Sequence, residues 1–248
     1  MVDPAVLVPF ILIGFAAQMI DGALGMAFGQ ISSTLLIAMG VPPAAASAGV
    51  HTAETFTTAV SGISHVAHRN VDWRLFFRLV VPGMIGGIAG AYLLSVSAEK
   101  AKPFVLAYLT LLGLYLFYRG VMHRHTEKTP RIVSPLGLVG GFLDAAGGGG
   151  WGGIVTSNLL VQGSNPRKTI GTVNTAEFFL TITISATFIA MLGWQVFTGA
   201  TLGLLIGGAC AAPFGAWIAK RVNADTLLTF VGALLTLVSL YGLYRALS

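Results

Sequence analysis

The fold is decided by two matching stretches of sequence, DGALGMAFG at residues 21–29 and DAAGGGGWGG at residues 144–153. Each begins with an aspartate, is rich in glycine and lies inside strongly apolar sequence. The match extends outward without a gap, because residues 14–58 and 137–181 share 15 identities in 45 positions at a constant offset of 123 residues. The chain therefore contains an internal duplication, and its two copies are expected to build one structure together.

The composition is that of an integral membrane protein. Of the 248 residues, 55% are hydrophobic and 9% are charged, whereas soluble domains carry about 25% charged residues. In lipid, only helices and closed barrels satisfy their own backbone, and the apolar runs here are long and do not alternate. We therefore expect an all-α integral membrane protein whose main surroundings are the lipid bilayer.

Several other classes are disfavoured. The net charge of +5 is explained by basic loops and does not indicate a nucleic-acid partner. Cys210 is the only cysteine, so neither a disulfide nor a thiolate metal cluster is expected. The N-terminus, Met1-Val2-Asp3-Pro4, has no basic region, so a cleaved signal peptide is not expected. No phosphate-binding P-loop pattern is present, and we expect no ATP-binding module, cofactor or metal.

Ten apolar segments can be traced, five in each half of the chain. The correspondence between the halves predicts one transmembrane domain made of repeat 1 (5–121) and repeat 2 (132–247), joined by a basic loop at 121–131. The segments are 5–20, 23–39, 44–66, 75–96, 103–120, 132–143, 145–163, 169–192, 196–219 and 226–246.

The basic residues predict how the repeats are oriented. Four loops hold 11 of the 14 Lys and Arg residues, and counting the crossings places all four loops on one side of the membrane. The positive-inside rule makes that side the cytoplasm and puts both termini on the other side. Equivalent bends of the two repeats then lie on opposite faces, which is the pattern of an inverted-topology repeat. The predicted cytoplasmic loops are 68–78, 119–131, 164–168 and 220–222.

The first two segments of each half are short. As a helix, residues 5–20 span about 24 Å, against a hydrocarbon core of about 30 Å, and residues 132–143 are shorter still. We interpret 5–39 and 132–163 as glycine-rich helical hairpins that enter from opposite faces. The sequence leaves open whether they are re-entrant, giving six crossings and two hairpins, or whether all ten helices cross. Interrupted segments at matching places in two halves are typical of a transporter's binding site.

The glycine-rich tips of these hairpins are candidates for anion binding. Glycine lets backbone N–H groups converge, and the start of a helix leaves several N–H groups free and a positive dipole end. Two tips that meet would suit a tetrahedral or pyramidal oxyanion. The alternative is that the glycines only allow close helix packing, and that the tryptophan among them only fills space. The predicted substrate-binding tip residues are Gly25, Gly29, Gly148, Gly149, Gly150, Trp151 and Gly152.

Four carboxylates repeat with the duplication: Asp21 and Glu54 in the first half, and Asp144 and Glu177 in the second. Ionisable groups are costly in hydrocarbon and usually mark a pathway or a site. We place the two aspartates as N-caps of the helices that follow them, with a protonatable group beside the substrate as the alternative. The two glutamates either lock the hairpins by accepting their N–H groups or relay a coupling proton, and both roles stay open.

The helix after each hairpin carries a polar face at helical spacing. In the first half this face comprises Ser47, His51, Glu54, Thr58, Ser61 and His65, and the second copy keeps Asn174, Glu177 and Thr181. We expect His51 to face Asn174 across the pseudo-symmetry axis. These two donors, together with the hydroxyls of Thr52, Thr172 and Thr175, complete the predicted substrate site.

These features resemble the TauE/SafE family of sulfite exporters, the toluene-sulfonate uptake permeases. The resemblance covers nearly the whole chain, and its most specific parts are the glycine-rich tip at 147–153 and the proline-containing segment at 166–174. The first-half counterpart is 40–48, whereas the first tip departs from the family's run of glycines. The resemblance implies export or uptake of sulfite, sulfonates or related organosulfur anions across a bacterial inner membrane, with both termini then in the periplasm.

The preferred hypothesis is a secondary transporter of such an anion, working by alternating access around a midplane site and having no enzymatic activity. One alternative is a cation or metal carrier built on the four carboxylates. The tips argue against it, because they offer hydrogen-bond donors, which suit an anion. Others are a non-transporting scaffold and an intramembrane protease with an Asp21–Asp144 dyad, although neither aspartate follows the Gly-x-Gly of such proteases. The exact anion, the direction of transport, the coupling ion and homo-oligomer formation are left open.

Overall fold

The computed structural model describes residues 4–24, 26–122, 129–219 and 224–247. Every regular element in these ranges is a helix, which confirms the predicted all-α class. The elements are α1 (Pro4–Leu24), α2 (Phe28–Ala38), α3 (Pro43–Ala67), α4 (Trp73–Val96), α5 (Ala98–Val121), α6 (Ser134–Gly147), the π-helical turn η1 (Gly152–Thr156), α7 (Ser157–Val161), α8 (Pro166–Leu192), the 3-10 turn η2 (Trp194–Val196), α9 (Gly199–Ala219) and α10 (Ala224–Leu247).

Prolines and capping side chains set several helix starts. Pro43 and Pro166, at equivalent places in the two repeats, open α3 and α8, where the missing N–H of proline leaves no hydrogen bond unmade. Asn165 Oδ1 also accepts from the Lys168 amide at 3.1 Å. At the start of α4, Asp72 Oδ1 accepts from the backbone amides of Arg74 and Leu75 at 2.9 and 3.1 Å. These local signals are why the long helices begin close to where the sequence predicts.

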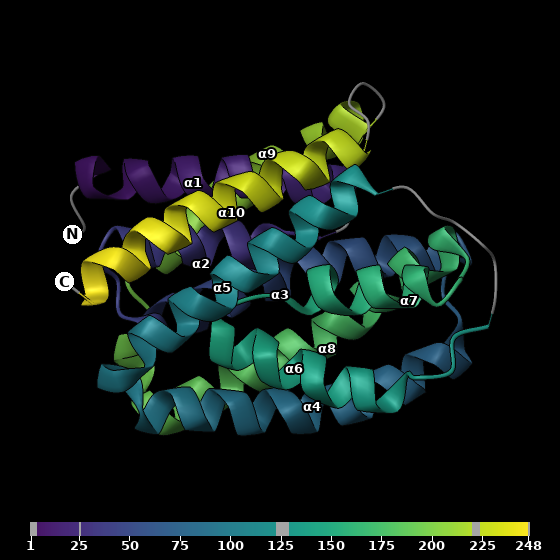
Figure 1. Ribbon diagram of the computed structural model, residues 1–248, viewed down its shortest axis with the longest axis horizontal. Helices are drawn as coiled ribbons and strands as arrows, with labels where there is room; N and C mark the ends of the chain where they lie inside the picture. Colours follow the sequence, from purple (N-terminus) through teal and green to yellow (C-terminus); the bar gives the residue numbers. More distant parts are fainter. Residues whose placement is uncertain (1–3, 25, 123–128, 220–223, 248) are drawn as a thin grey trace.

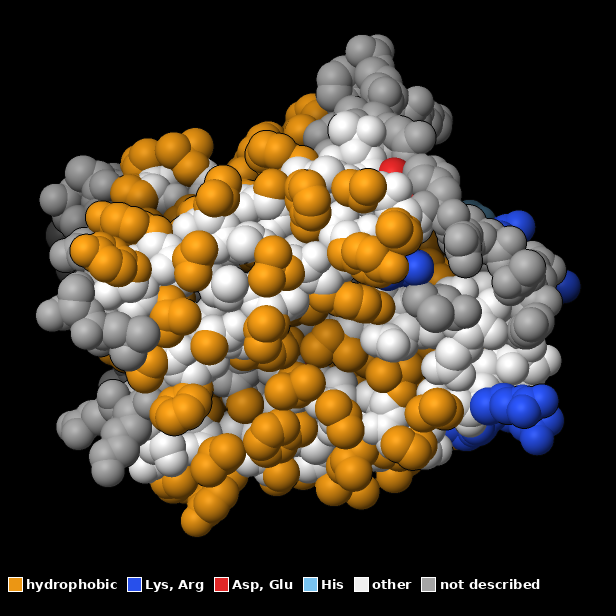
Figure 2. Space-filling view, in the orientation of Figure 1, with side chains coloured by type: hydrophobic (Ala, Val, Ile, Leu, Met, Phe, Trp, Pro, Cys, Tyr) orange, Lys and Arg blue, Asp and Glu red, His pale blue; other side chains and the backbone are white. Residues whose placement is uncertain are grey.

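The two hairpins enter the molecule from opposite ends. In Figure 1 the α1–α2 hairpin begins and ends at the left, where both termini lie, whereas the α6–α7 hairpin begins and ends at the right. Figure 2 shows hydrophobic side chains over the middle of the molecule and Lys and Arg side chains toward the right-hand end. The described basic loops therefore share one end, and residues 123–128 and 220–223 lie outside the described part of the chain.

Three of the described helices are long and apolar enough to cross a membrane, namely Trp73–Val96, Lys102–Val121 and Arg167–Leu192. Shorter apolar helices cover Leu7–Asp21, Phe28–Ala38, Gly199–Ala211 and Thr229–Tyr244. The short segments include α1 and α2, which form the first predicted hairpin.

Helices of the first half pack mainly against helices of the second half. The main pairs are α1 with α9, α4 with α6, α5 with α10 and α3 with α8. Glycine allows the closest of these contacts, because a Cβ on Gly86 would lie 2.0 Å from the Leu138 carbonyl oxygen and one on Gly207 would lie 2.0 Å from the Ile11 carbonyl oxygen. For these glycines within helices, close packing explains the residue type.

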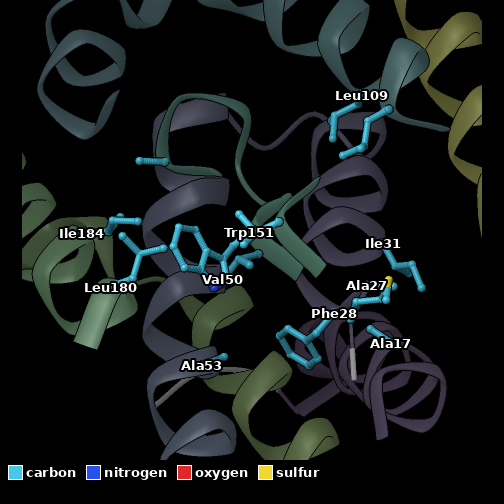
Figure 3. Close-up of a cluster of buried hydrophobic side chains, with 14 of the residues drawn as sticks. Ala17, Ala27, Phe28, Ile31, Val50, Ala53, Leu109, Trp151, Leu180 and Ile184 are labelled. Carbon is cyan, nitrogen blue, oxygen red and sulfur yellow. The ribbon is translucent and has the colours of Figure 1, made fainter. Parts of the chain in front are cut away.

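The aromatic residue that follows each hairpin turn is buried in the core. Figure 3 shows Trp151 directed toward Leu180 and Ile184 of α8, with Phe28 beside Ala27. Trp151 is fully buried, and its Nε1 donates to the Val173 carbonyl at 3.2 Å. The core thus holds the helical segment that follows each hairpin turn in place.

Candidate functional site

The turns of the two hairpins touch each other through backbone. A Cβ built on Gly149 would lie 2.4 Å from the carbonyl carbon of Gly29. A Cβ on Gly29 would lie 3.0 Å from Gly149 Cα and 2.9 Å from Glu54 Oε1. No side chain fits between these backbones, so glycine is required at both positions. Gly25, the other predicted glycine of the first tip, lies outside the described residues.

The second turn depends on three consecutive glycines. Gly148, Gly149 and Gly150 have φ values of 77°, 141° and 151°, which side chains with a Cβ rarely adopt. The amides of Gly148 and Gly149 both donate to the Asp144 carbonyl, which ends α6 in a left-handed cap. In the first hairpin, Ala27 occupies the position equivalent to Gly150 and also has a positive φ, 105°.

One aspartate carboxylate spans each turn. Asp144 Oδ1 accepts from the Trp151 amide at 2.8 Å, and Asp21 Oδ1 accepts from the Phe28 amide at 3.3 Å. The predicted N-cap position was wrong, because α1 and α6 continue past these residues and the aspartates lie in the last turns of those helices. The predicted interaction is nevertheless made, since each carboxylate reaches across the turn to an amide where the chain resumes its helical course.

His51 connects the first repeat to the second tip. Its Nε2 lies 2.9 Å from Asp144 Oδ2 and its Nδ1 lies 2.7 Å from the Ser47 carbonyl oxygen. Both ring nitrogens face acceptors, so the His51–Asp144 pair holds two protons, either as imidazolium and carboxylate or as neutral imidazole and carboxylic acid. Ser47 Oγ adds a hydrogen bond to the Ala145 carbonyl at 2.8 Å. These contacts fix α3 against the end of α6.

Glu54 lies at the contact between the tips. It is buried, and the backbone amide of Gly29 is its hydrogen-bond donor. Its second oxygen, Oε2, is buried without a hydrogen-bond partner among the described residues. Glu54 thus makes the kind of contact that the hairpin-locking hypothesis requires, and its other oxygen is left for a proton or another donor.

Glu177 completes a group of four acidic side chains. It is half-buried on α8 and lies within electrostatic range of Glu54, Asp21 and Asp144. The duplication therefore brings all four carboxyl groups to one region around the tips. In a medium of low dielectric such a group is expected to exchange protons, because four negative charges held together would be very costly.

The predicted polar residues of α8 have other partners. Thr172 Oγ1 accepts from the Asp72 amide at 2.8 Å and so holds the start of α4. Asn174, expected to face the repeat-related histidine, instead donates to Ser61 Oγ at 3.3 Å. Thr175 Oγ1 donates to a backbone carbonyl one turn earlier at 2.7 Å. These three hydrogen bonds are made within α8 and to residues of α3 and the start of α4, whereas Gly152 follows directly on the second turn.

Two contacts with the second tip were missed in the sequence. Tyr108 Oη, from α5, donates to the Gly149 carbonyl at 3.2 Å, and Ser33 Oγ, from α2, donates to the Gly148 carbonyl. A Cβ on Gly150 would lie 2.0 Å from the Tyr108 hydroxyl. Both residues come from helices distant in the sequence, and no spacing pattern connects them to the tip.

A cavity of about 730 Å³ lies between α3, α8 and the start of α9. Its polar lining consists of hydroxyl groups, from Thr52, Thr55, Ser185, Thr198 and Thr201, and the rest is mainly apolar. Thr52 Oγ1 donates to Ser185 Oγ at 3.4 Å. Of the predicted substrate-binding residues, Thr52 is the one that lines this cavity.

Comparison with known proteins gives the family. Residues 10–242 match the family model described as sulfite exporter TauE/SafE. The chain belongs to the TauE/SafE family. Among curated proteins, it is 41% identical over 243 residues to the "Probable membrane transporter protein YtnM" of Bacillus subtilis (strain 168), an alignment that covers 94% of this chain and 81% of the relative. No solved structure matches the chain. The TauE/SafE assignment confirms the resemblance, and both names describe membrane transporters rather than enzymes.

Proposed function

We propose that this TauE/SafE protein is a secondary transporter that carries a small sulfur-containing anion through the region where the two tips meet. The family and the relative support membrane transport. The observation that carries the anion proposal is that the tips already bind carboxylates, because the amides of Phe28, Gly29 and Trp151 each donate to an acidic side chain. An oxyanion offers acceptors of the same kind and can compete for these amides.

The family description makes sulfite or a sulfonate the first choice of anion. A sulfite or sulfonate group carries three oxygens in a pyramidal arrangement, against two on a carboxylate, so one such group can accept from amides of both tips at once. Binding would then release Glu54 from the first tip, because both acceptors need the Gly29 amide. In this proposal the acidic side chains occupy the site in the absence of the anion and leave it when the anion binds.

We further propose that the repeats are inverted in the membrane and that alternating access arises when the two repeats exchange conformations. The packing of α1 on α9 has a counterpart in that of α6 on α4. Thr52 contacts Ser185, and at the 123-residue offset these residues are equivalent to Thr175 and Gly62, which also contact each other. Together with the basic residues at one end, these pairs support an inner-membrane protein whose termini face the periplasm.

Labelling of single cysteines tests this topology. In a Cys210→Ser background, which removes the only native thiol, Met39→Cys and Asn165→Cys place thiols at exposed positions beside equivalent bends of the two repeats. A membrane-impermeant maleimide should label Met39→Cys from the periplasmic side and Asn165→Cys only from the cytoplasmic side. Labelling of both thiols from the same side would refute the inverted arrangement.

Binding and flux measurements test the substrate. Purified protein should show a higher melting temperature with sulfite or a sulfonate such as taurine or sulfoacetate, because a ligand at 100 times its Kd stabilises the folded state by about 2.7 kcal/mol. The same anion should enter or leave proteoliposomes with saturable kinetics. Stabilisation and flux competition by divalent cations, with no response to any sulfur anion, would support the cation carrier instead.

Substitution of the two glutamates distinguishes the hairpin-locking hypothesis from the proton-relay hypothesis. Glutamine at position 54 keeps an oxygen for the Gly29 amide but removes the exchangeable acidic proton. We therefore expect Glu54→Gln and Glu177→Gln to abolish accumulation of the anion driven by a proton gradient while leaving part of the anion exchange. Equal loss of accumulation and exchange would show that the glutamates act only as structural locks.

A further inference from the structure

The two ends of the α3–α8 crossing differ in how tightly they are packed. At the end near η2, a cavity of about 730 Å³ is lined by α3, α8 and α9. At the end near the basic loops, aromatic rings of α4 and α8 fill the corresponding place, with Phe76 5.7 Å from Phe179 and Phe178 5.2 Å from Phe179 between ring centroids. One end is therefore open and the other closed.

The residues at the two ends correspond through the duplication. Phe56, on the cavity wall, is equivalent to Phe179 at the 123-residue offset. The sequence Trp-x-x-Phe occurs at the start of α4 and again at η2, and the rings touch in both copies, at 5.4 Å for Trp73–Phe76 and 5.6 Å for Trp194–Phe197. The difference lies in one contact, since Phe76 meets Phe179 whereas no ring contact joins Phe56 to Phe197 among the described residues.

We propose that Phe76–Phe179 is a closed inner gate, that Phe56–Phe197 is the equivalent outer gate in its open state, and that the cavity is the vestibule through which the anion enters from outside. This inference rests on the proposed transport function. It assigns the structure to an outward-facing state. The inward-facing state would form when Phe56 packs on Phe197 and Phe76 separates from Phe179, so that the two repeats exchange conformations.

The exposed lining of the cavity is mainly apolar, with some hydroxyl groups. Five hydroxyl side chains line it, and they include Thr201, whose hydroxyl is buried without a hydrogen-bond partner among the described residues. The Thr201 hydroxyl faces α3, because a Cβ on Gly49 would lie 2.7 Å from its Oγ1. The lining runs along α8 from Ile189 to Ile182, about 10 Å along the helix, toward Glu177.

Reactivity of a matched pair of thiols tests the assignment without any substrate. In the Cys210→Ser background, Thr52→Cys lies on the cavity wall and Thr175→Cys lies at the repeat-equivalent position, against Gly62 of α3. A membrane-impermeant methanethiosulfonate added outside should modify Thr52→Cys at least about tenfold faster than Thr175→Cys is modified from either side, which corresponds to a minor inward-facing population. Equal rates would overturn the proposal, as would modification of Thr52→Cys by lipid-soluble reagents alone, which would make the cavity a lipid-filled groove.

Weakening the inner gate should reverse this pattern. Phe76→Ala removes a buried ring from the closed gate, so Thr175→Cys should become reactive from the cytoplasmic side while Thr52→Cys slows. Phe104→Ala is the matched control, because its ring is 75% exposed on α5 and belongs to neither gate. Phe76→Leu serves if the alanine variant does not fold. Unchanged rates in a folded Phe76 variant would refute the gate. Asymmetric labelling without anion flux would instead refute the proposed function and keep the gates.

Discussion

Asp144→Ala is expected to be the most damaging single substitution at the site, with loss of transport and a large fall in melting temperature. The carboxylate uses both oxygens, accepting from the Trp151 amide at 2.8 Å and pairing with His51 Nε2 at 2.9 Å, and all three residues are buried. Removing one partner of a buried ion pair costs about 3–5 kcal/mol, and an unpaired buried amide adds about 1–3 kcal/mol. Thermal unfolding of the purified protein and anion flux in proteoliposomes measure the two effects.

The repeat-related aspartate provides the control for this prediction. Asp21 is half-buried and accepts a hydrogen bond from the Phe28 amide at 3.3 Å, so Asp21→Ala is expected to cost about 1 kcal/mol, as for loss of a helix cap. The pairing with His51 predicts that His51→Ala and Asp144→Ala are not additive, and that the double variant loses little more stability than Asp144→Ala. Equal destabilisation at the two aspartates, or additivity with His51, would contradict the assigned contacts.

The general arrangement of the helices could be predicted because the duplication and the charges each constrain it. Matching acidic and glycine-rich stretches indicated two hairpins, and the distribution of Lys and Arg indicated that the basic loops share one end, as in Figure 2. The exact place of each turn was not predicted. Asp21 and Asp144 suggested helix starts, yet α1 and α6 run on to Leu24 and Gly147. In the second hairpin the residues after Asp144 continue the helix until the left-handed Gly148 ends it.

The contacts of the site could be predicted only in part. A sequence repeat shows which residues are equivalent, but it does not show which residues contact each other. It indicated that four carboxyl groups belong to one site, and Glu177 lies within electrostatic range of the other three. It also suggested that His51 faces Asn174, whereas His51 bonds to Asp144 of the opposite repeat. Tyr108 has no signal in the sequence at all, because its contact with Gly149 depends on how α5 lies against α6.

Gly149→Ala is expected to abolish transport, because this position is where the two hairpins touch. Its φ of 141° is unfavourable for alanine, which costs about 1–3 kcal/mol. The added Cβ would also lie 2.4 Å from the Gly29 carbonyl carbon and 2.7 Å from the Gln30 nitrogen. These are backbone atoms that cannot rotate away, so the tips must separate, and the overpacking adds about 1–3 kcal/mol. Loss of flux together with a lower melting temperature is the expected result.

Gly208→Ala is the matched control for the tip. A Cβ at Gly208 would meet its nearest atom, Phe28 Cε2, at 3.4 Å, an ordinary contact within α9, so the variant should keep its flux and gain up to about 1 kcal/mol from the better helix propensity of alanine. Met26, the first-repeat equivalent of Gly149, already carries a side chain and has no positive φ. At this repeat position glycine is therefore needed on the second hairpin only, and Met26→Ala should retain transport. Full flux in Gly149→Ala would show that the anion does not pass where the tips meet.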